Sequence, residues 1–217
     1  MNEKYLIGSW QGFIQQIQYL VSRGYNRYCL IQYPQEKTKK FVKIDQKLIS
    51  KYNANLNKDK AYYNKKKGYC NFKFLRYENV AILLQTSGNL PEKIIQDDVF
   101  LDVKKEKICI DIGEKTSVTI GVDEKGAITI FLHNDTYRFV KATCFQYIDS
   151  EQYSRAIHTF NHLNSLPSWG GIVTQKVKMK TQILRKMSKN LPSKQVEALA
   201  GKMMINTKRT PVKVFKS

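Results

Sequence analysis

The chain has 217 residues, of which 42% are hydrophobic and 12% aromatic, so it can bury a sizeable core and is not a disordered protein. Its 37 lysines and arginines outnumber its 18 acidic residues, and the net charge of +19 favours a polyanionic partner. Because it lacks both an apolar run of about 18 residues and a signal-peptide pattern, we expect a cytoplasmic protein with no membrane partner.

The excess positive charge is confined to two segments. Residues 37–76 and residues 176–217 each carry a net charge of +11, whereas residues 77–175 carry a net charge of −4. A surface that served only solubility would intersperse both signs. The two basic segments are therefore the candidates for contact with a polyanion.

The first third of the chain is predicted to alternate between helix and strand. Residues 11–25 place apolar side chains at helical spacing, and Gly24 is their stop signal. A strand over residues 27–33 precedes a second helix over residues 38–53, whose lysines lie opposite its apolar face. The Asn- and Lys-rich stretch 53–68 has no apolar period, which predicts a basic loop.

Strands and then helices are predicted for the rest of the chain. We expect strands over residues 70–77, 80–86, 107–113, 117–122, 127–134 and 136–148, with turns at Glu78-Asn79 and near Gly126. Helices are expected over residues 150–166, capped by Ser150, then 176–190 and 193–204, before an extended end over 210–215.

The fold class that follows is α+β, with an N-terminal helix-strand-helix, a mostly antiparallel sheet and a basic helical C-terminal tail. We expect a core domain over residues 1–165 and a helical extension over residues 166–217, packed on or beside it. The cysteines, which lie far apart without C-x-x-C spacing, predict neither a zinc site nor a disulfide framework. We expect all four to be reduced packing residues on strands: Cys29, Cys70, Cys109 and Cys144.

Residues 67–74, KGYCNFKF, resemble the signature of the third strand of the RNA-recognition motif, K/R-G-F/Y-G/A-F-V-x-F/Y. Asn71 and Phe72 invert the aromatic and aliphatic pair of that signature. The resemblance implies RNA binding by aromatic side chains on a sheet, with residues 27–33 as the other aromatic strand. The family has a strand where residues 53–67 predict a loop, so the resemblance covers only these short stretches. The positions that match are Lys67, Gly68, Tyr69 and Phe74, with Cys70 as the small residue.

Aromatic and basic residues also interleave throughout this region, independently of any family. Lysines can neutralise phosphates, and exposed aromatic rings can stack on unpaired bases. Period-two alternation favours burial of Phe72 and Phe74, so we assign stacking to the tyrosines. The predicted contacts are Lys58, Lys60, Tyr62, Tyr63, Lys65, Lys66, Lys67, Tyr69, Lys73 and Arg76.

The predicted helix over residues 176–190 is amphipathic and basic. Its apolar stripe runs from Met179 to Leu191, and Lys178, Arg185 and Lys189 lie on a separate polar face. Such a helix can also lie on an anionic membrane, but the absence of Trp and Phe from its stripe favours nucleic acid. The C-terminal candidates for phosphate contact are Lys178, Arg185, Lys189, Lys208 and Arg209.

Catalytic patterns are few, and no cofactor or metal is expected. His158 and His162 are four residues apart, but the Glu of H-E-x-x-H is missing. The strand around Asp111 resembles the first strand of RNase H-like and sugar-kinase-like folds, which implies a metal held with Asp123 and Asp135 as partners.

A metal-independent endoribonuclease resembling the CRISPR repeat-processing enzymes is another alternative. That resemblance implies proton transfer by groups such as His133 and Tyr137 at the end of a strand. The glycine-rich C-terminal loop of that family is not evident; Gly170-Gly171 is the nearest approach.

Our first hypothesis is a non-enzymatic nucleic-acid-binding protein that prefers RNA over DNA. The second is the structure-specific endoribonuclease. The third is a subunit that uses its basic faces to join a larger ribonucleoprotein or mobile-element complex.

Overall fold

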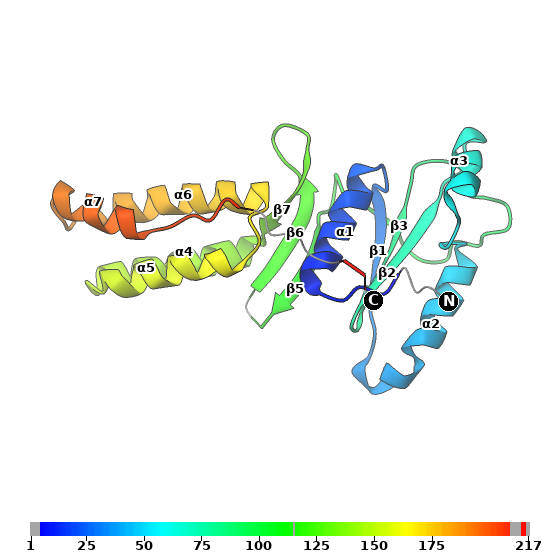
Figure 1. The fold of residues 1–217 in the computed structure, drawn as a ribbon, viewed down its shortest axis with the longest axis horizontal. Helices are drawn as coiled ribbons and strands as arrows, with labels where there is room; N and C mark the ends of the chain where they lie inside the picture. The colour runs from blue at the N-terminus through cyan, green and yellow to red at the C-terminus, as the bar shows by residue number, and fades with distance from the viewer. Residues whose placement is uncertain (1–4, 115, 209–213, 216–217) are drawn as a thin grey trace. The chain divides into compact units, whose positions relative to one another are not determined.

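The computed structural model describes residues 5–114, 116–208 and 214–215. It has the predicted α+β class, with antiparallel sheets and C-terminal helices (Figure 1). The chain divides into two compact units: the first contains residues 1–108, 120–128 and 212–217, and the second contains residues 109–119 and 129–211. The boundary expected at residue 165 lies inside the second unit.

A four-stranded sheet forms the centre of the first unit. Its strands are β1 (Arg27–Gln32), β2 (Phe72–Tyr77), β3 (Val80–Gln85) and β4 (Leu101–Asp102), in the order β2-β3-β1-β4. β1 pairs antiparallel with β3 and β4, and β2 pairs antiparallel with β3 across the predicted turn at Glu78-Asn79. No helix lies between β3 and β4 in the described chain, unlike the β-α-β-β-α-β arrangement.

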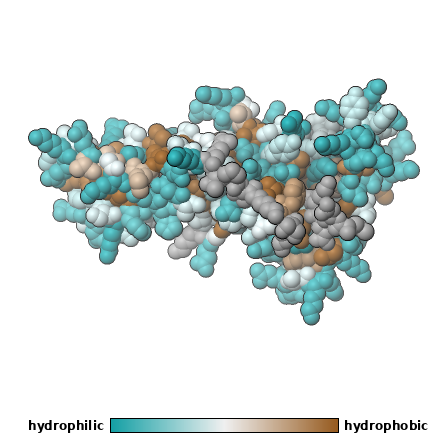
Figure 2. Space-filling view, in the orientation of Figure 1, coloured by the Kyte–Doolittle hydropathy of each residue, from teal (hydrophilic) through white to brown (hydrophobic). Residues whose placement is uncertain are grey.

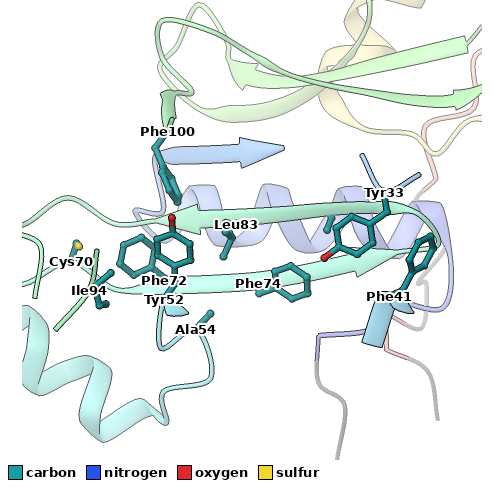
Figure 3. Close-up of a cluster of buried hydrophobic side chains, with 11 residues drawn as sticks. Tyr33, Phe41, Tyr52, Ala54, Cys70, Phe72, Phe74, Leu83, Ile94 and Phe100 are labelled. Atoms are coloured by element: carbon teal, nitrogen blue, oxygen red, sulfur yellow. The ribbon is translucent and has the colours of Figure 1, made fainter. Parts of the chain in front are cut away.

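Helices cover both faces of this sheet. Phe13 of α1 (Trp10–Ser22) lies on one face, with its ring centroid 6.3 Å from that of Tyr77. The short 3-10 helix η1 (Gln35–Lys40) leads into α2 (Phe41–Lys51) on the other face. Figure 3 shows the cluster of buried aromatic side chains, in which Tyr52 lies beside Phe72; their ring centroids are 5.0 Å apart.

The predicted burial of Phe72 and Phe74 is confirmed, since they are 2% and 3% exposed. Residues 81–84 of β3 are fully buried because both faces of the strand are covered. The aromatic residues of KGYCNFKF that lie on β2 therefore belong to the core. They do not form an open platform of the kind that the RNA-recognition motif presents.

In the described residues, the second unit contains four α-helices, and a three-stranded sheet follows β4 in the chain. The strands are β5 (Ile108–Gly113), β6 (Thr116–Val122) and β7 (Ile128–Leu132), in that order. The helices are α4 (Asn134–Asp149), α5 (Tyr153–His162), α6 (Gly170–Met187) and α7 (Ser193–Lys202), with a 3-10 turn η2 (Leu163–Ser165) after α5.

Two predicted elements are wrong. The basic loop expected over residues 53–68 contains the helix α3 (Lys58–Lys66). The strand expected over residues 136–148 belongs to α4, whose buried Thr136, Cys144 and Ile148 recur at helical spacing. Aromatic and β-branched residues favoured a strand there, but packing of one helix face decided the conformation. The predicted helix at residue 176 begins earlier, at Gly170.

The cysteines are free, as predicted, but they do not all pack on strands. Cys70 is buried just before β2, and Cys144 is buried on the helix α4. Cys109 lies on β5 and is exposed. Only Cys29 is a partly buried strand residue, on β1. The extended end predicted over residues 210–215 lies mostly outside the described residues.

Candidate nucleic-acid interface

The helix α3 begins and ends at capping residues. Asn57 is its N-cap and accepts a hydrogen bond from the backbone N–H of Lys60 at 2.9 Å. Asp59 occupies the first turn, where a carboxylate favours the positive end of the helix. Gly68 ends it with a φ of 78°, a conformation that glycine adopts without strain. The sequence contains these three capping signals, which favour a helix even though the segment has no apolar periodicity.

One face of α3 lines a cavity of about 460 Å³. The residues on that face follow the i, i+3, i+4, i+7 spacing of a helix and are Lys60, Tyr63, Asn64 and Lys67. Tyr69, just after the helix, lines the same cavity. The structure therefore brings together two of the three predicted stacking tyrosines and two of the predicted lysines.

The opposite wall of the cavity comes from the loop after β3. Pro91, Glu92, Lys93 and Ile94 line it from that side. The loop is held by backbone hydrogen bonds from Cys70 N to Asn89 O and from Asn89 N to Gly68 O, each 2.8 Å long. Gly88 permits this approach, because a Cβ there would lie 2.8 Å from the backbone nitrogen of Cys70.

Two amide side chains form the polar part of the wall. Asn71 is 5% exposed and donates from Nδ2 to the carbonyl of Ala61 at 2.8 Å. Its Oδ1 accepts a hydrogen bond from Asn64 Nδ2 at 3.1 Å. Among the described residues, the Oδ1 of Asn64 accepts no hydrogen bond. A ligand in the cavity can therefore use the carbonyl oxygen and the second N–H of that amide.

The other face of α3 points away from the cavity. Lys58, Tyr62, Lys65 and Lys66 recur on it at helical spacing, and all four are exposed. Tyr62 and Tyr63 are 66% and 62% exposed as residues, and their ring centroids are 6.4 Å apart. Hydrophilic residues dominate the surface around α3 on the face shown in Figure 2.

Two further predicted contacts lie on β2 and not on α3, and they also lie apart from this cavity. Lys73 is half-buried and donates from Nζ to the carbonyl of Leu56 at 3.2 Å, and burial lowers its pKa. It lines a separate cavity of about 560 Å³ together with Lys58. Arg76 is 7% exposed and ion-paired with Asp45 at 2.8 Å, because it shares the buried face of β2 with Phe72. Arg76 is therefore a structural residue.

The individual contacts predicted from the sequence do not include Lys93 or the exposed lysines of α2. Lys93 is exposed and lies across the cavity from α3, a neighbourhood that only the tertiary fold creates. Lys39, Lys43 and Lys47 are exposed and recur every four residues along η1 and α2, so they share one side of the helix. In the sequence, the only indication of these three exposed lysines is the high net charge of residues 37–76.

In the second unit, α6 has the predicted amphipathic character. Met179, Ile183 and Met187 are fully buried, whereas Lys178, Arg185 and Lys189 are exposed. None of these three cations has an ion pair in the part of the chain that the structure describes. Lys208 is exposed after α7, and Arg209 lies outside the described residues.

The candidate catalytic residues have structural roles. His133 caps α4, where its Nδ1 accepts from the backbone of Asp135 at 3.3 Å. Tyr137 donates to Gln182 Oε1 at 3.3 Å, and burial raises its pKa, which disfavours a general base.

The acidic residues considered as metal ligands also make structural hydrogen bonds. Asp111 accepts from Ser117 Oγ at 2.6 Å, and Asp123 accepts from two backbone amides of the β6-β7 turn. Among the described residues, no three His, Cys, Asp or Glu side chains gather as metal ligands would. His158 and His162 are exposed neighbours on α5.

Comparison with protein-family models, with curated proteins and with solved structures finds no match to this chain. Within the described ranges, no helix is both long and apolar enough to cross a membrane. Arguments about function therefore depend on the geometry and charge of the chain itself.

Proposed function

We propose that the protein binds nucleic acid, with RNA preferred over DNA, and does so without cleaving it. In this proposal the exposed lysines of α3 and α6 contact the phosphate backbone, and tyrosines of α3 stack on unpaired bases. The observation that carries the proposal is the α3 cavity, where Lys60, Tyr63, Lys67 and Tyr69 meet.

The chemistry of this cavity matches the parts of a nucleotide. Its volume of about 460 Å³ lies within the range of small-ligand sites and accommodates a nucleobase. Tyr63 and Tyr69 provide aromatic surface, the Asn64 amide provides a donor and an acceptor, and lysines provide positive charge at the rim. The carboxylate of Glu92 on the opposite wall favours contact with the base there over contact with a phosphate.

The preference for RNA comes from the need for an unpaired base. Proteins recognise RNA mainly at single-stranded loops, bulges and ends, where bases can leave the stack and meet aromatic rings. A duplex offers the lysines of α3 and α6 only its phosphates. We therefore expect single-stranded RNA to bind more tightly than duplex DNA of the same length.

Fluorescence anisotropy with labelled single-stranded RNA, in buffer containing EDTA, tests the proposal. Tyr63→Ala should weaken binding by about 1–3 kcal/mol, the usual value for one stacked base. Tyr19→Ala, which removes a tyrosine that is 51% exposed on α1, is the matched control and should bind like the wild type. Equal binding by Tyr63→Ala and the wild type would contradict the cavity, and cleavage of the RNA would favour the endoribonuclease.

A further inference from the structure

The chain that follows α7 is held in an extended conformation by two asparagine side chains. Asn161 donates from Nδ2 to the carbonyl of Lys202 at 2.9 Å and accepts from the backbone N–H of Met204 at 3.0 Å. Asn164 repeats this pattern with the carbonyl of Met204 at 2.9 Å and the N–H of Asn206 at 3.1 Å. We name Met203–Asn206 the strap.

Among the described residues, two further side chains donate hydrogen bonds to the strap, and both reach its backbone. Ser168 donates from Oγ to the carbonyl of Asn206 at 2.7 Å, and Lys180 donates from Nζ to the carbonyl of Met203 at 2.7 Å. Main-chain groups are the same in every extended polypeptide, so these contacts do not depend on the sequence of the strap. The strap surface, formed by Asn161, Asn164, Ser168 and Lys180, therefore recognises an extended backbone.

One side chain of the strap, that of Met203, is buried. Met203 is 2% exposed, whereas Met204 is 64% exposed. An occupant of this surface therefore needs an extended backbone and one apolar side chain at the position of Met203. Many polypeptides can meet those two conditions.

The helix α7, which leads into the strap, is weakly held by apolar packing. No residue of α7 is buried. A cavity of about 690 Å³ is lined by Gln195, Ala198 and Leu199 of α7 and by Tyr153 at the start of α5. Elements with few buried apolar contacts open at low free-energy cost. Release of the strap therefore exposes Met203 and breaks the hydrogen bonds of its backbone, but it leaves the buried faces of α4, α5 and α6 packed.

Charge favours an occupant other than the strap. The strap surface provides the ammonium group of Lys180, and buried Lys176 donates to Asn164 Oδ1 from below at 3.3 Å. The native occupant is flanked by further cations, Lys202 and Lys208. No carboxylate among the described residues hydrogen-bonds to the strap surface. An acidic segment would gain attraction where the native strap meets like charge.

We propose that the strap surface is a docking site for an extended, acidic segment of a partner protein, and that the chain's own strap closes it in the free protein. The partner segment carries an apolar residue at the position of Met203. It replaces the backbone of residues 202–206 on Asn161 and Asn164.

The experiment uses the full-length protein and a fluorescent peptide spanning residues 201–208 with Lys202→Glu and Lys208→Glu. This acidic peptide should bind saturably, and the peptide of native sequence should bind at least about fivefold more weakly, because it lacks the charge gain. Both compete with a tethered strap at an effective concentration of about a millimolar. An acidic peptide that also carries Met203→Asp should not bind.

Two readouts locate the binding. The affinity of the acidic peptide relative to the native-sequence peptide should fall at least about threefold in Lys180→Gln, which removes the cation beside the strap, whereas Asn190→Ala, in the exposed turn after α6, should not change it. In the wild type, hydrogen exchange at Met204 N–H and Asn206 N–H should accelerate when the peptide saturates, because the displaced strap no longer donates to Asn161 and Asn164. No binding, binding that leaves both amides protected, or peptide-sensitive dimerisation of the chain would each overturn the proposal.

Discussion

Arg76 of β2 donates from Nε to Oδ2 of Asp45 on α2 across 2.8 Å, in a site where the carboxylate is fully buried. Tyr33 donates to the other carboxylate oxygen at 3.0 Å, and Arg76 Nη1 donates to the carbonyl of Glu78 at 2.6 Å. These contacts connect α2 to the sheet at the end of the aromatic core. They also explain why Arg76, although basic, does not contribute to the exposed charge.

Removing Arg76 should destabilise the first unit strongly. Arg76→Ala leaves the Asp45 carboxylate buried without its cation, and such a change costs about 3–5 kcal/mol. Guanidinium unfolding followed by circular dichroism would measure it, with Arg23→Ala on the exposed end of α1 as the control. Asp45→Leu combined with Arg76→Met should recover most of the loss. A stable Arg76→Ala protein would show that the pair is dispensable.

Truncation of Phe72 should impair folding, whereas truncation of Tyr62 should leave the fold intact. Phe72→Ala empties a position in contact with Tyr52 and Phe100 and should cost about 3–5 kcal/mol of unfolding free energy. Tyr62→Ala, on the exposed face of α3, should change stability by less than about 0.5 kcal/mol. Thermal and denaturant unfolding of both variants checks this. If Phe72→Ala folds normally but fails to bind RNA, its side chain acts as the RNA-recognition motif would imply.

Lys176 makes the stability of the second unit depend on pH. Its side chain is fully buried, its one hydrogen bond among the described residues is to Asn164, and burial lowers its pKa. Between that lowered pKa and the ordinary lysine value of about 10.5, the unfolded chain binds more protons than the folded chain, so stability rises with pH. Lys176→Met has no such amine, so its unfolding free energy lacks this pH dependence, and we expect it to be more stable than the wild type at pH 7. Unfolding free energies at pH 7 and pH 10 should therefore show the variant's advantage shrinking as pH rises, and a constant difference would contradict the burial of a titrating amine.

Charge removal from α3 should weaken binding without affecting the fold. Lys65, Lys66 and Lys67 are exposed at the end of the helix, and replacing all three with Ala should leave the melting temperature unchanged. Affinity should fall for every RNA sequence, and the salt slope for single strands should decrease by about 2. Replacing Lys104, Lys105 and Lys125 removes the same charge outside both basic segments and is the control. A lower melting temperature for the first variant alone would show that these lysines support the fold.

Local patterns were sufficient to predict much of this fold. The apolar spacing of α1, α2 and α6 and the turn at Glu78-Asn79 depend on neighbours in sequence, and each is confirmed. α3 was missed because the helix exposes most of its surface, so it has no apolar stripe and depends on Asn57 and Gly68 for its ends. α4 was mistaken because its aromatic and β-branched residues have strand propensity that tertiary packing overrides.

The residues of the candidate interface also differ in whether local sequence could predict them. Tyr62, Tyr63 and the lysines around them could be named from composition, because their exposure follows from the absence of apolar neighbours. The pairing of Arg76 with Asp45 and the position of Lys93 opposite α3 both join residues far apart in sequence. Single-sequence patterns contain no information about such contacts, so Arg76 was assigned to the interface and Lys93 was not.

The most direct test of the account is the salt dependence of RNA binding by the wild-type protein. Two basic segments with a net charge of +11 each should release counterions from the phosphates that they contact. Anisotropy titrations of single-stranded RNA between low and physiological salt should give a plot of log K against log salt concentration that falls with a slope of several units. An affinity that stays constant over this range would contradict phosphate binding and the proposed function with it.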